Sequence, residues 1–379
     1  MKKLEAIYLD YNATTPLDPA VLETMLPFFK KHFGNPSSGH VCGKSSKEAI
    51  SKAREQTAKL IGAQTNEILF TSGGTESNNH ALIGTAFANM EKGKHIISSE
   101  IEHPAVLETL QYLQERFQFK VTYLPVDNYG MVNPSDVQKA MTPETVLITI
   151  MHANNEVGTI NPIEEIGKIA KEENVTFHTD AAQSCGKIPV NVKKLNAALL
   201  SIAGHKLYAP KGIGALYIRN GTKLDKFIHG AGQEQGRRAG TENVPYIIGI
   251  GYACEIASGD LSNYGKNVRT LRDRLHRNIF DGLGEKRVKL NGHPEKRLPN
   301  TLNISIKGSI GEELLKRIPE IAASTGSACH ANSTEPSAVL LAMGIPKEQA
   351  LGALRLSLGR WSTQSKIDEA ARLIVNQAR

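Results

Sequence analysis

The chain has 379 residues, of which 40% are hydrophobic and 22% are charged, and its formal net charge at pH 7 is +7. These values are typical of a folded globular chain, and they exclude peptide-sized, fibrous and low-complexity proteins. The length predicts two domains. The surplus of Lys and Arg is small and spread along the chain, so an acidic small molecule or an acidic protein partner is a better expectation than direct binding of nucleic acid.

The first residues contain Glu5 and Asp10 where a secretory signal would need an apolar core, and no stretch is as long and apolar as a membrane span. We therefore expect a cytoplasmic protein that does not interact with a membrane. The four cysteines lie far apart, without the paired spacing of a zinc site or a disulfide framework, so we expect reduced thiols and no metal. Cys185 and Cys254 have the surroundings of structural residues, whereas the pattern around Cys42 decides nothing.

Strand-like and helix-like patterns alternate between residues 65 and 220. Runs rich in β-branched and aromatic residues predict strands at residues 68–70, 95–97, 121–124, 146–150, 175–178, 199–202 and 215–218. The helical patterns between them lie at residues 77–90, 104–117 and 162–173, the last with Asn161 as its expected N-cap. This alternation predicts an α/β fold with a mostly parallel, seven-stranded sheet flanked by helices.

Beyond residue 255 the pattern changes. A long helical pattern at residues 261–282 is followed by strand patterns at 302–306 and 353–357 and by helical patterns at 336–343 and 366–376. This order predicts a smaller α+β domain. We expect a large domain at residues 15–255 and a small domain made of residues 1–14 and 256–379.

Polar residues follow most of the predicted strands at their carboxyl ends. The clusters are residues 71–77, 102–103, 152–156, 178–183 and 203–206. Because ligands of an open parallel sheet bind beyond these strand ends, one site built from several strands is expected.

Gly73, Gly74 and Thr75 stand between a predicted strand and a helix start, where free backbone N–H groups favour a phosphate. The segment lacks the lysine of a nucleotide-binding P-loop and the three-glycine dinucleotide pattern. On its own it is better explained as a tight turn with a helix cap. A second glycine pair, Gly249 and Gly251, is expected to allow close helix packing.

Lys206 follows a predicted strand and has mostly apolar residues after it. In a cleft, loss of solvation would let its amine form an imine with a carbonyl, and an exposed loop lysine is the alternative. Asp180 ends another strand and could pair with a pyridinium N–H, cap a helix or bind magnesium. Together, the glycine turn, Asp180 and Lys206 match the phosphate, ring nitrogen and aldehyde of pyridoxal 5′-phosphate (PLP), so they predict a PLP site.

Three further residues are candidates for the same site. His103 precedes a helix, where an imidazole could stack on a flat ring and move protons, or only cap the helix. Cys329 lies in a polar segment of small residues, which is a poor place for a core cysteine and a good place for a reactive thiol. Arg355 lies in an alternating strand, from which it could face water or bind a carboxylate in a cleft.

Ten segments of the chain match one family pattern and together cover nearly its whole length. They are residues 9–16, 33–38, 71–78, 102–103, 152–158, 178–183, 204–206, 237–243, 324–329 and 355–360. In these segments the sequence resembles the cysteine desulfurases of the class V aminotransferase group, which are PLP-dependent enzymes of fold type I. The resemblance therefore implies that fold and that cofactor.

On the cofactor side, the resemblance implies that Lys206 holds PLP as an imine, that Asp180 pairs with the ring nitrogen and that Gln183 bonds the ring hydroxyl. His103 would stack on the ring and move protons, and Asn155 would also contact the cofactor. The residues that would hold the phosphate are Gly74, Thr75 and His205, together with Thr241 from the other subunit of a homodimer.

On the substrate side, the resemblance implies that Asn155 and Arg355 bind the carboxylate of L-cysteine and that Cys329, on a loop of the small domain, is the nucleophile. L-Cysteine would replace Lys206 on the cofactor and lose its α-proton, and the thiolate of Cys329 would attack the substrate sulfur. Alanine would leave and a persulfide would remain on Cys329. An acceptor protein would take this sulfur for iron–sulfur cluster assembly, tRNA thiolation or DNA phosphorothioation.

The sequence departs from the family pattern at Ala203, where many relatives have a serine that contacts the phosphate. His330 is more similar to selenocysteine lyases and to the desulfurases of DNA phosphorothioation than to housekeeping iron–sulfur enzymes. The chain also ends at Arg379, without the segment on which those housekeeping enzymes dock their scaffold. Three alternatives follow: a selenocysteine lyase, a plain aminotransferase that would not need Cys329, and a non-catalytic PLP-binding scaffold for a sulfur-transfer partner.

Overall fold

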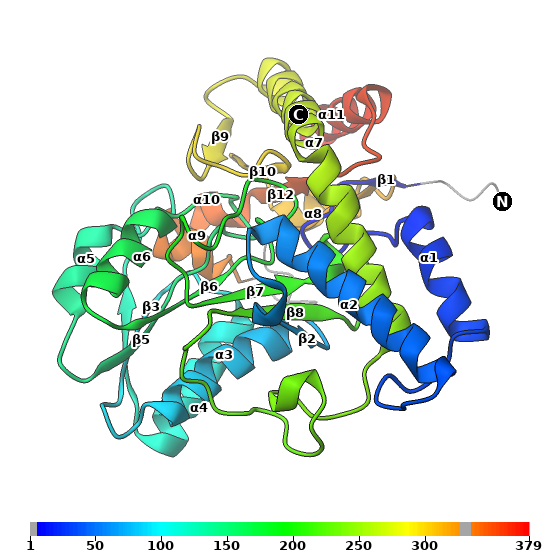
Figure 1. Ribbon diagram of the computed structural model, residues 1–379. Helices are drawn as coiled ribbons and strands as arrows, with labels where there is room; N and C mark the ends of the chain where they lie inside the picture. The colour runs from blue at the N-terminus through cyan, green and yellow to red at the C-terminus, as the bar shows by residue number, and fades with distance from the viewer. Residues whose placement is uncertain (1–5, 326–334, 379) are drawn as a thin grey trace.

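The computed structural model describes residues 6–325 and 335–378. A seven-stranded sheet in the order β2-β8-β7-β6-β5-β3-β4 forms the centre of the larger part of the molecule (Figure 1). Its strands are β2 (Ile68–Thr71), β3 (His95–Ser99), β4 (Lys120–Leu124), β5 (Thr145–Thr149), β6 (Thr176–Asp180), β7 (Leu199–Ala203) and β8 (Gly214–Ile218). β8 is antiparallel to both of its neighbours, and all other neighbouring strands are parallel. The predicted α/β fold with a mostly parallel sheet is confirmed.

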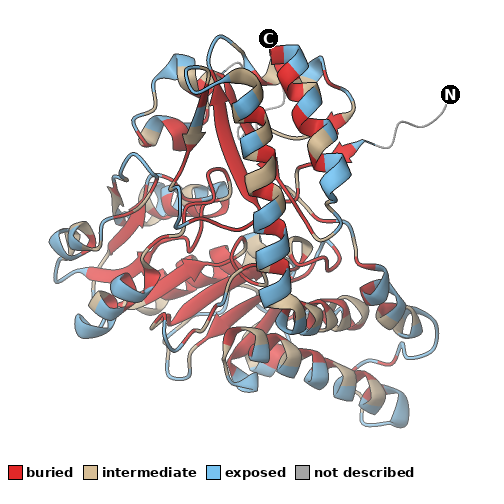
Figure 2. Ribbon diagram, turned by 90° about the horizontal axis from the view of Figure 1, so that it is seen from above, coloured by how far each residue is buried: buried red, intermediate tan, exposed pale blue. Residues whose placement is uncertain are grey.

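Helices cover both faces of this sheet, and successive residues of a strand face opposite layers. The helices are α1 (Pro19–Lys30), α2 (Val41–Ile61), α3 (Gly74–Ala88), α4 (Pro104–Phe117), α5 (Pro134–Ala140) and α6 (Ile163–Glu172), with short 3₁₀ turns η1 (Thr65–Glu67), η2 (Gly204–Lys206) and η3 (Glu234–Gly236). Leu147 and Leu199 belong to the hydrophobic cluster that includes α3 and α4. Their neighbours Ile148 and Leu200 belong to the cluster that includes α1, α2 and α6. Figure 2 shows the buried strands between the outer helices.

The remaining elements form a second group, most of which packs around a core of its own. The strands are β1 (Ile7–Tyr8), β9 (Val288–Asn291), β10 (Thr301–Ile306), β11 (Ile321–Ala322) and β12 (Ala353–Ser357), and the helices are α7 (Val244–Leu283), α8 (Gly311–Lys316), α9 (Ala338–Ala342), α10 (Lys347–Leu351) and α11 (Gln364–Ala378). β12, β10 and β9 form an antiparallel sheet, and β1 pairs with β11. The 40-residue helix α7 joins both groups, because Ala257 packs in one core and Tyr264 in the other. A division at residue 255 stays a prediction.

Two glycines in the first half of α7 allow close packing, as predicted. A Cβ on Gly251 would lie 2.5 Å from the Cα of Ala53 in α2, and a Cβ on Gly249 would lie 2.8 Å from the Sδ of Met25 in α1. A side chain at Gly251 would therefore push α7 and α2 apart, whereas one at Gly249 would require the Met25 side chain to move.

Two predicted features differ from the structure. The helix expected at residues 261–282 begins at Val244. The sequence patterns also did not predict β1, β9, β11, α1, α2, α5, α8 and α10. Asn161 does not cap α6, which lacks a side-chain cap. Instead the Asn161 amide accepts a hydrogen bond from the Val132 N–H at 3.0 Å and donates one to the Met151 carbonyl at 2.9 Å, so its side chain joins two loops.

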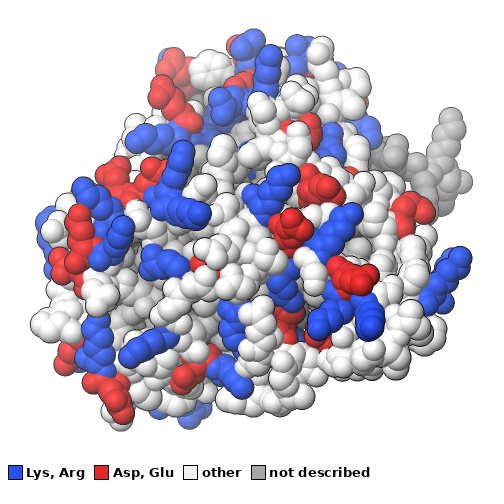
Figure 3. Space-filling model, viewed as in Figure 1, with Lys and Arg blue, Asp and Glu red and all other residues white. Residues whose placement is uncertain are grey.

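The distribution of surface charge and the burial of two cysteines agree with what the sequence predicts. On the face shown in Figure 3, basic side chains are interspersed with acidic and uncharged ones. Cys185 and Cys254 are fully buried, as expected of structural residues, and Cys42 is exposed. In residues 6–325 and 335–378, no helix has both the length and the apolar character needed to cross a membrane.

Candidate active site

A cavity of about 500 Å³ lies at the carboxyl ends of the central strands, as predicted. The predicted site residues that line it are Gly74, Thr75, His103, Asn155, Asp180, Gln183, His205, Lys206 and Arg355. They come from positions more than 280 residues apart in the chain, and the fold brings them to one place. Asn12, Asn78, Glu156 and Ser337 line the same cavity and were not predicted as individual site residues.

The N-terminus of α3 forms one end of the cavity. Gly74 is the first residue of this helix, and a Cβ there would lie 3.1 Å from the Cβ of Ala203, so the glycine lets the helix end approach β7. His205 lies beside it, with Nδ1 at 3.1 Å from the Thr14 hydroxyl, and burial lowers its pKa to about 4. Free backbone N–H groups, a helix dipole and a neutral imidazole suit a phosphate group.

Asp180 is the last residue of β6 and is 6% exposed. Its Oδ2 accepts a hydrogen bond from Asn78 Nδ2 at 2.7 Å, and its Oδ1 accepts one from the Ala182 N–H at 2.9 Å. These two bonds fix the carboxylate, which can still accept another donor because each oxygen has two lone pairs. A pyridinium N–H would supply the positive partner that a buried carboxylate needs.

Lys206 lies in η2, directly after β7. Its Nζ donates hydrogen bonds to the carbonyl oxygens of Asn12 and Ala13, the latter at 2.6 Å. Burial, with a further contribution from the charge of Arg355, lowers the pKa of this amine to about 8. At pH 7 about a tenth of the amine is thus unprotonated, far more than for an ordinary lysine, and the unprotonated amine is the nucleophilic form. The structure places Lys206 in a cleft and not on an exposed loop, and its imine-forming role stays a prediction.

His103 caps a helix and also lines the cavity, so its predicted role as a cap is observed, whereas stacking on a ring and proton transfer stay predictions. Its Nδ1 accepts a hydrogen bond from the Ala105 N–H at 3.0 Å at the start of α4. Burial lowers the pKa of the imidazole, although the charge of Asp180 opposes this. In the neutral ring the proton must then reside on Nε2, because Nδ1 is the acceptor.

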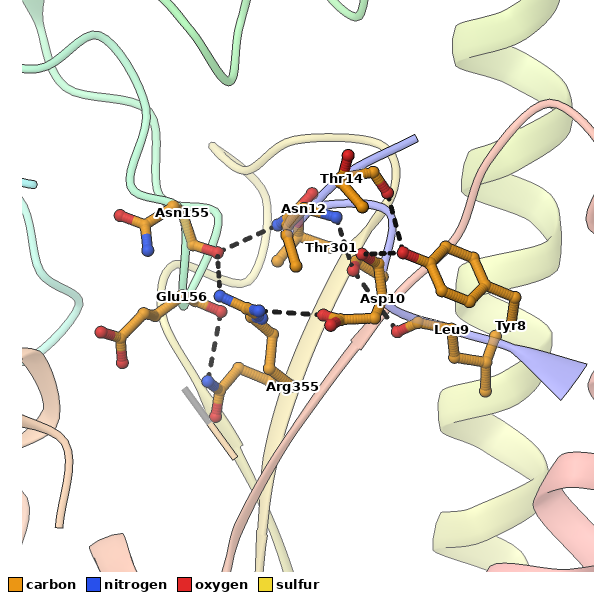
Figure 4. A network of polar contacts seen from close by, with 12 residues as sticks. Tyr8, Leu9, Asp10, Asn12, Thr14, Asn155, Glu156, Thr301 and Arg355 are labelled. Carbon is orange, nitrogen blue, oxygen red and sulfur yellow. Dashed lines mark hydrogen bonds and ion pairs between the residues drawn. The ribbon is translucent and has the colours of Figure 1, made fainter. Parts of the chain in front are cut away.

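Arg355 in β12 is 2% exposed and reaches into the cavity wall instead of facing water. It forms an ion pair with Asp10 at 2.9 Å and donates to the carbonyl of Asn155 at 3.5 Å (Figure 4). Its Nε has no hydrogen-bond partner in the part of the chain that the structure describes. A buried guanidinium in the wall of the cavity fits a carboxylate ligand.

Asn12 connects the two sides of the cavity (Figure 4). Its Nδ2 donates to the Asn155 carbonyl at 3.0 Å and to the Thr301 hydroxyl at 2.8 Å. Its own carbonyl accepts from Gln183 Nε2 at 3.0 Å, and its side-chain oxygen accepts from Asn300 Nδ2 at 2.9 Å. The cofactor-side and substrate-side candidates are therefore held by one buried residue.

Glu156 and Ser337 form a second unpredicted contact in the cavity wall. The hydroxyl of Ser337 donates to a carboxyl oxygen of Glu156 and accepts from the Leu340 N–H at 3.2 Å, which caps α9. Burial raises the pKa of Glu156 to about 7, while the hydrogen bond from Ser337 lowers it. This contact joins the loop after β5 to the chain that follows the segment containing Cys329.

Two predicted residues are not placed in this cavity. Thr241 lines a separate cavity of about 190 Å³ together with Thr71 and Arg238. Cys329 and its neighbour His330 lie outside the described residues. The contribution of Thr241 to a phosphate site and the nucleophilic role of Cys329 therefore stay predictions.

Comparison with known proteins identifies relatives over nearly the whole chain. The model of the aminotransferase class-V family matches residues 7–370. A protein described as cysteine desulfurase IscS from Methanosarcina thermophila is 52% identical over 373 residues, which are 98% of this chain and 91% of the relative. A solved structure of a NifS-like protein is 39% identical, with a TM-score of 0.91 and 98% of each chain covered. Another structure, SspA in complex with cysteine, is also 39% identical, with a TM-score of 0.81 and coverage of 94% of this chain and 99% of that chain.

The fold, the cavity and the family match define an enzyme of the aminotransferase class-V type, whose cofactor is PLP. The residues in the cavity fit this cofactor, because a helix N-terminus, a buried carboxylate and a desolvated amine converge there. With relatives at 52% identity over nearly its full length, the chain belongs to the cysteine desulfurases of this family. The family resemblance stated from the sequence is confirmed.

Proposed function

We propose that the cavity binds L-cysteine beside PLP and that the sulfur atom passes to Cys329 as a persulfide, with alanine as the other product. The observation that carries this proposal is the convergence of Lys206, Asp180 and the N-terminus of α3 in one cavity. These groups would hold the aldehyde, the ring nitrogen and the phosphate of PLP. When bound, PLP would supply the electron sink that stabilises negative charge at the substrate α-carbon.

Arg355 and Asn155 would bind the carboxylate of L-cysteine. The guanidinium of Arg355 lines the cavity, where Asp10 and the Asn155 carbonyl would hold it in place for this carboxylate. Because the guanidinium is buried, its interaction with a carboxylate is strong. The side-chain amide of Asn155, which lines the same cavity, would donate a second hydrogen bond. Two contacts to one carboxylate fix the orientation of the substrate.

Lys206 and His103 would move the protons. Lys206, as an unprotonated amine, would accept the α-proton of the substrate at Nζ, and the carbonyls of Asn12 and Ala13 would then accept hydrogen bonds from the ammonium. His103 carries its proton on Nε2 as long as Nδ1 caps α4, so it would act as a proton donor at Nε2.

The sulfur transfer balances without an external oxidant or reductant. The thiolate of Cys329 would attack Sγ of the substrate, so that an S–S bond forms as the Cβ–Sγ bond breaks. The electron pair of the broken bond stays with Cβ, which takes up a proton to give alanine. Cys329 Sγ and the transferred sulfur are oxidised in the persulfide, and Cβ is reduced by the same two electrons.

The proposal includes a homodimer, in which Thr241 of one subunit contacts the phosphate bound by the other, and an acceptor protein for the sulfur. A cytoplasmic location, as expected from the sequence, is part of it. An acceptor in iron–sulfur cluster assembly, tRNA thiolation or DNA phosphorothioation would take the sulfur from Cys329. The separate location of Thr241 supports the dimer, because Thr241 is placed apart from the cavity of its own chain.

One preparation tests the proposed reaction. The purified protein should have the visible absorbance of bound PLP, release alanine from L-cysteine in the presence of a thiol reductant, and carry one additional sulfur atom on the Cys329 peptide by mass spectrometry. Cys329→Ser should keep the absorbance but form neither sulfide nor persulfide, whereas Cys42→Ser, at an exposed position, should behave like the wild type. Lys206→Ala should lose the cofactor linkage that borohydride reduces.

Two results would overturn the proposal. Turnover of L-cysteine by Cys329→Ser would remove the sulfur relay. A yellow wild-type protein that releases no alanine would instead indicate a PLP-binding scaffold without this activity.

A further inference from the structure

Lys187 is a buried lysine next to the cavity that the proposed reaction does not use. It is 4% exposed and follows Gln183 by four residues in the turns after β6. Its Nζ donates to Oε1 of Gln183 at 2.7 Å, and its other contact is a longer one of 3.5 Å to the side-chain oxygen of Asn12.

The burial of Lys187 costs free energy that no neighbouring carboxylate offsets. None of the ion pairs between described residues includes Lys187. Burial lowers its pKa well below the usual value, the charges of Lys206 and Arg355 lower it further, and only the thiol of Cys185 acts in the opposite direction. Removing a cation from water costs several kcal/mol unless it is paired. An apolar side chain would occupy this position with a smaller loss of folding free energy. We therefore looked for a role of the Lys187 amino group in the neighbouring site.

Two contacts fix which end of the Gln183 amide faces which neighbour. The backbone carbonyl of Asn12 can only accept, so the NH₂ group of Gln183, which donates to it at 3.0 Å, must face Asn12 and the cavity wall. The amide oxygen then faces the other way, where it accepts the hydrogen bond from Lys187 Nζ. Without Lys187, Oε1 of Gln183 would lose this donor, and the hydrogen bond to the Asn12 carbonyl alone would hold the amide in place.

We propose that Lys187 is a positioning residue that holds Gln183 with its NH₂ group available to the ring hydroxyl of PLP. This inference rests on the proposed function, in which Gln183 contacts that hydroxyl. A hydrogen bond donated to the ring oxygen favours its ionised form. Lys187 would therefore lower the pH at which the bound cofactor changes its visible absorbance, and it would do so through Gln183.

The test is a pH titration of the visible absorbance of the PLP-loaded protein. Lys187→Met and Gln183→Ala should each raise the midpoint by about one pH unit, which is the effect of one hydrogen bond to a charged group. The double variant should have the midpoint of Gln183→Ala, because Lys187 acts only through that residue. Lys193→Met changes an exposed lysine of the same segment and should leave the midpoint unchanged.

An unchanged midpoint in Lys187→Met, or a double variant whose shift is the sum of the two single shifts, would overturn the role of Lys187. Replacing a buried cation by an apolar residue is often tolerated. Should the Met variant not fold, Lys187→Ala enters the same comparison with the same expected results. A wild-type protein without cofactor absorbance would overturn the proposed function together with this inference. If the wild-type protein binds the cofactor and titrates but the variants do not behave as expected, only the role of Lys187 is overturned.

Discussion

His103 has two tasks that substitution can separate. Its Nδ1 caps α4, and the same ring lines the cavity. His103→Asn should keep a good N-cap without the imidazole, whereas His103→Ala removes both. Both variants should lower kcat for alanine release by about 100-fold or more. Only the Ala variant should also lower the free energy of unfolding, by about 1 kcal/mol.

The two quantities are measured by steady-state kinetics and by urea unfolding of the same preparations. An Asn variant with the kcat of the wild type would exclude proton transfer by His103. Equal losses of stability in both variants would show that the ring stabilises the fold through contacts other than the cap.

Glu102 should make the free energy of unfolding fall as the pH rises, which is the opposite of the effect of a carboxylate whose pKa is lowered by folding. It is 3% exposed, accepts hydrogen bonds from the Ser99 hydroxyl and the Met151 N–H, and burial raises its pKa to about 8. Between its ordinary pKa near 4.5 and about 8, the folded protein holds a proton that the unfolded chain has lost. The free energy of unfolding contributed by Glu102 is therefore fully present below pH 4.5 and falls as the pH rises to 8.

Glu102→Gln tests this dependence because the amide resembles the protonated acid but cannot ionise. Relative to the wild type, the variant should gain about 2–4 kcal/mol in free energy of unfolding when the pH rises from 5 to 8.5. Denaturant unfolding at both pH values measures the difference. The exposed neighbour Glu100 gives the control, since Glu100→Gln should show no such gain. Parallel curves for Glu102→Gln and the wild type would mean that Glu102 is ionised in the folded protein.

At the scale of the elements, the central sheet could be predicted well because most of its strands contain short runs of β-branched and other apolar residues bounded by turns. β3, β5 and β7 are buried along their whole length, and this pattern is visible in the sequence alone. The start of α7 could not be predicted, since Pro245, Gly249 and Gly251 hide its periodicity. β9 is only four residues long and partly exposed, so it gives little pattern.

In the site, residues at strand ends could be predicted from the sequence, but contacts between distant residues could not. Lys206 and Asp180 could be predicted because each stands at the end of a recognisable strand. The contacts of Asn12 could not, because its partners Asn300 and Thr301 lie 288 and 289 residues away and such pairing leaves no local signal. The same holds for the ion pair of Arg355 with Asp10 and for the hydrogen bond of Asn78 to Asp180.

Packing of α7 against α2 predicts different outcomes for two glycines of one helix. A Cβ on Gly251 would lie 2.5 Å from the Ala53 Cα, which is backbone and cannot move alone, whereas a Cβ on Gly259 would meet no atom within 4 Å. Gly251→Ala should lower the free energy of unfolding by about 1–3 kcal/mol. Gly259→Ala should raise it by up to about 1 kcal/mol through helix propensity. Thermal and urea unfolding of both variants measure these changes, and equal effects would contradict the packing argument.

At the scale of the whole molecule, α7 is the main link between the two cores. Ala257 and Tyr264 lie in different hydrophobic clusters, so neither cluster is complete without the helix. The cavity also depends on both parts, because Lys206 lies in the first and Arg355 in the second. Under the proposed function, cofactor binding by Lys206 and substrate binding by Arg355 would therefore both depend on the relative position of the two parts.

The proposed homodimer adds a further requirement, which mixed dimers can test. Thr241 lines a cavity that differs from that of Lys206 in the same chain. If Thr241 serves the other subunit, a dimer of one Lys206→Ala chain and one Thr241→Ala chain contains one site with both residues intact. Random pairing of the two chains makes half of the dimers mixed, and each mixed dimer has one intact site of two. Co-expression should therefore give about one quarter of the wild-type activity, in addition to the residual activity of the Thr241→Ala dimers.

The control combines Lys206→Ala with Asp180→Asn, two residues that line the same cavity of one chain. In this mixed dimer each site has one defect, so activity should stay at the level of the single variants. Mixed dimers purified through a different affinity tag on each chain have one intact site of two, so with Thr241→Ala their alanine release should be about half that of the wild type, whereas the control should stay near the single variants. If mixing with Thr241→Ala restored no more activity than this control, Thr241 would act within its own subunit or not at all, and the shared phosphate site would have to be abandoned.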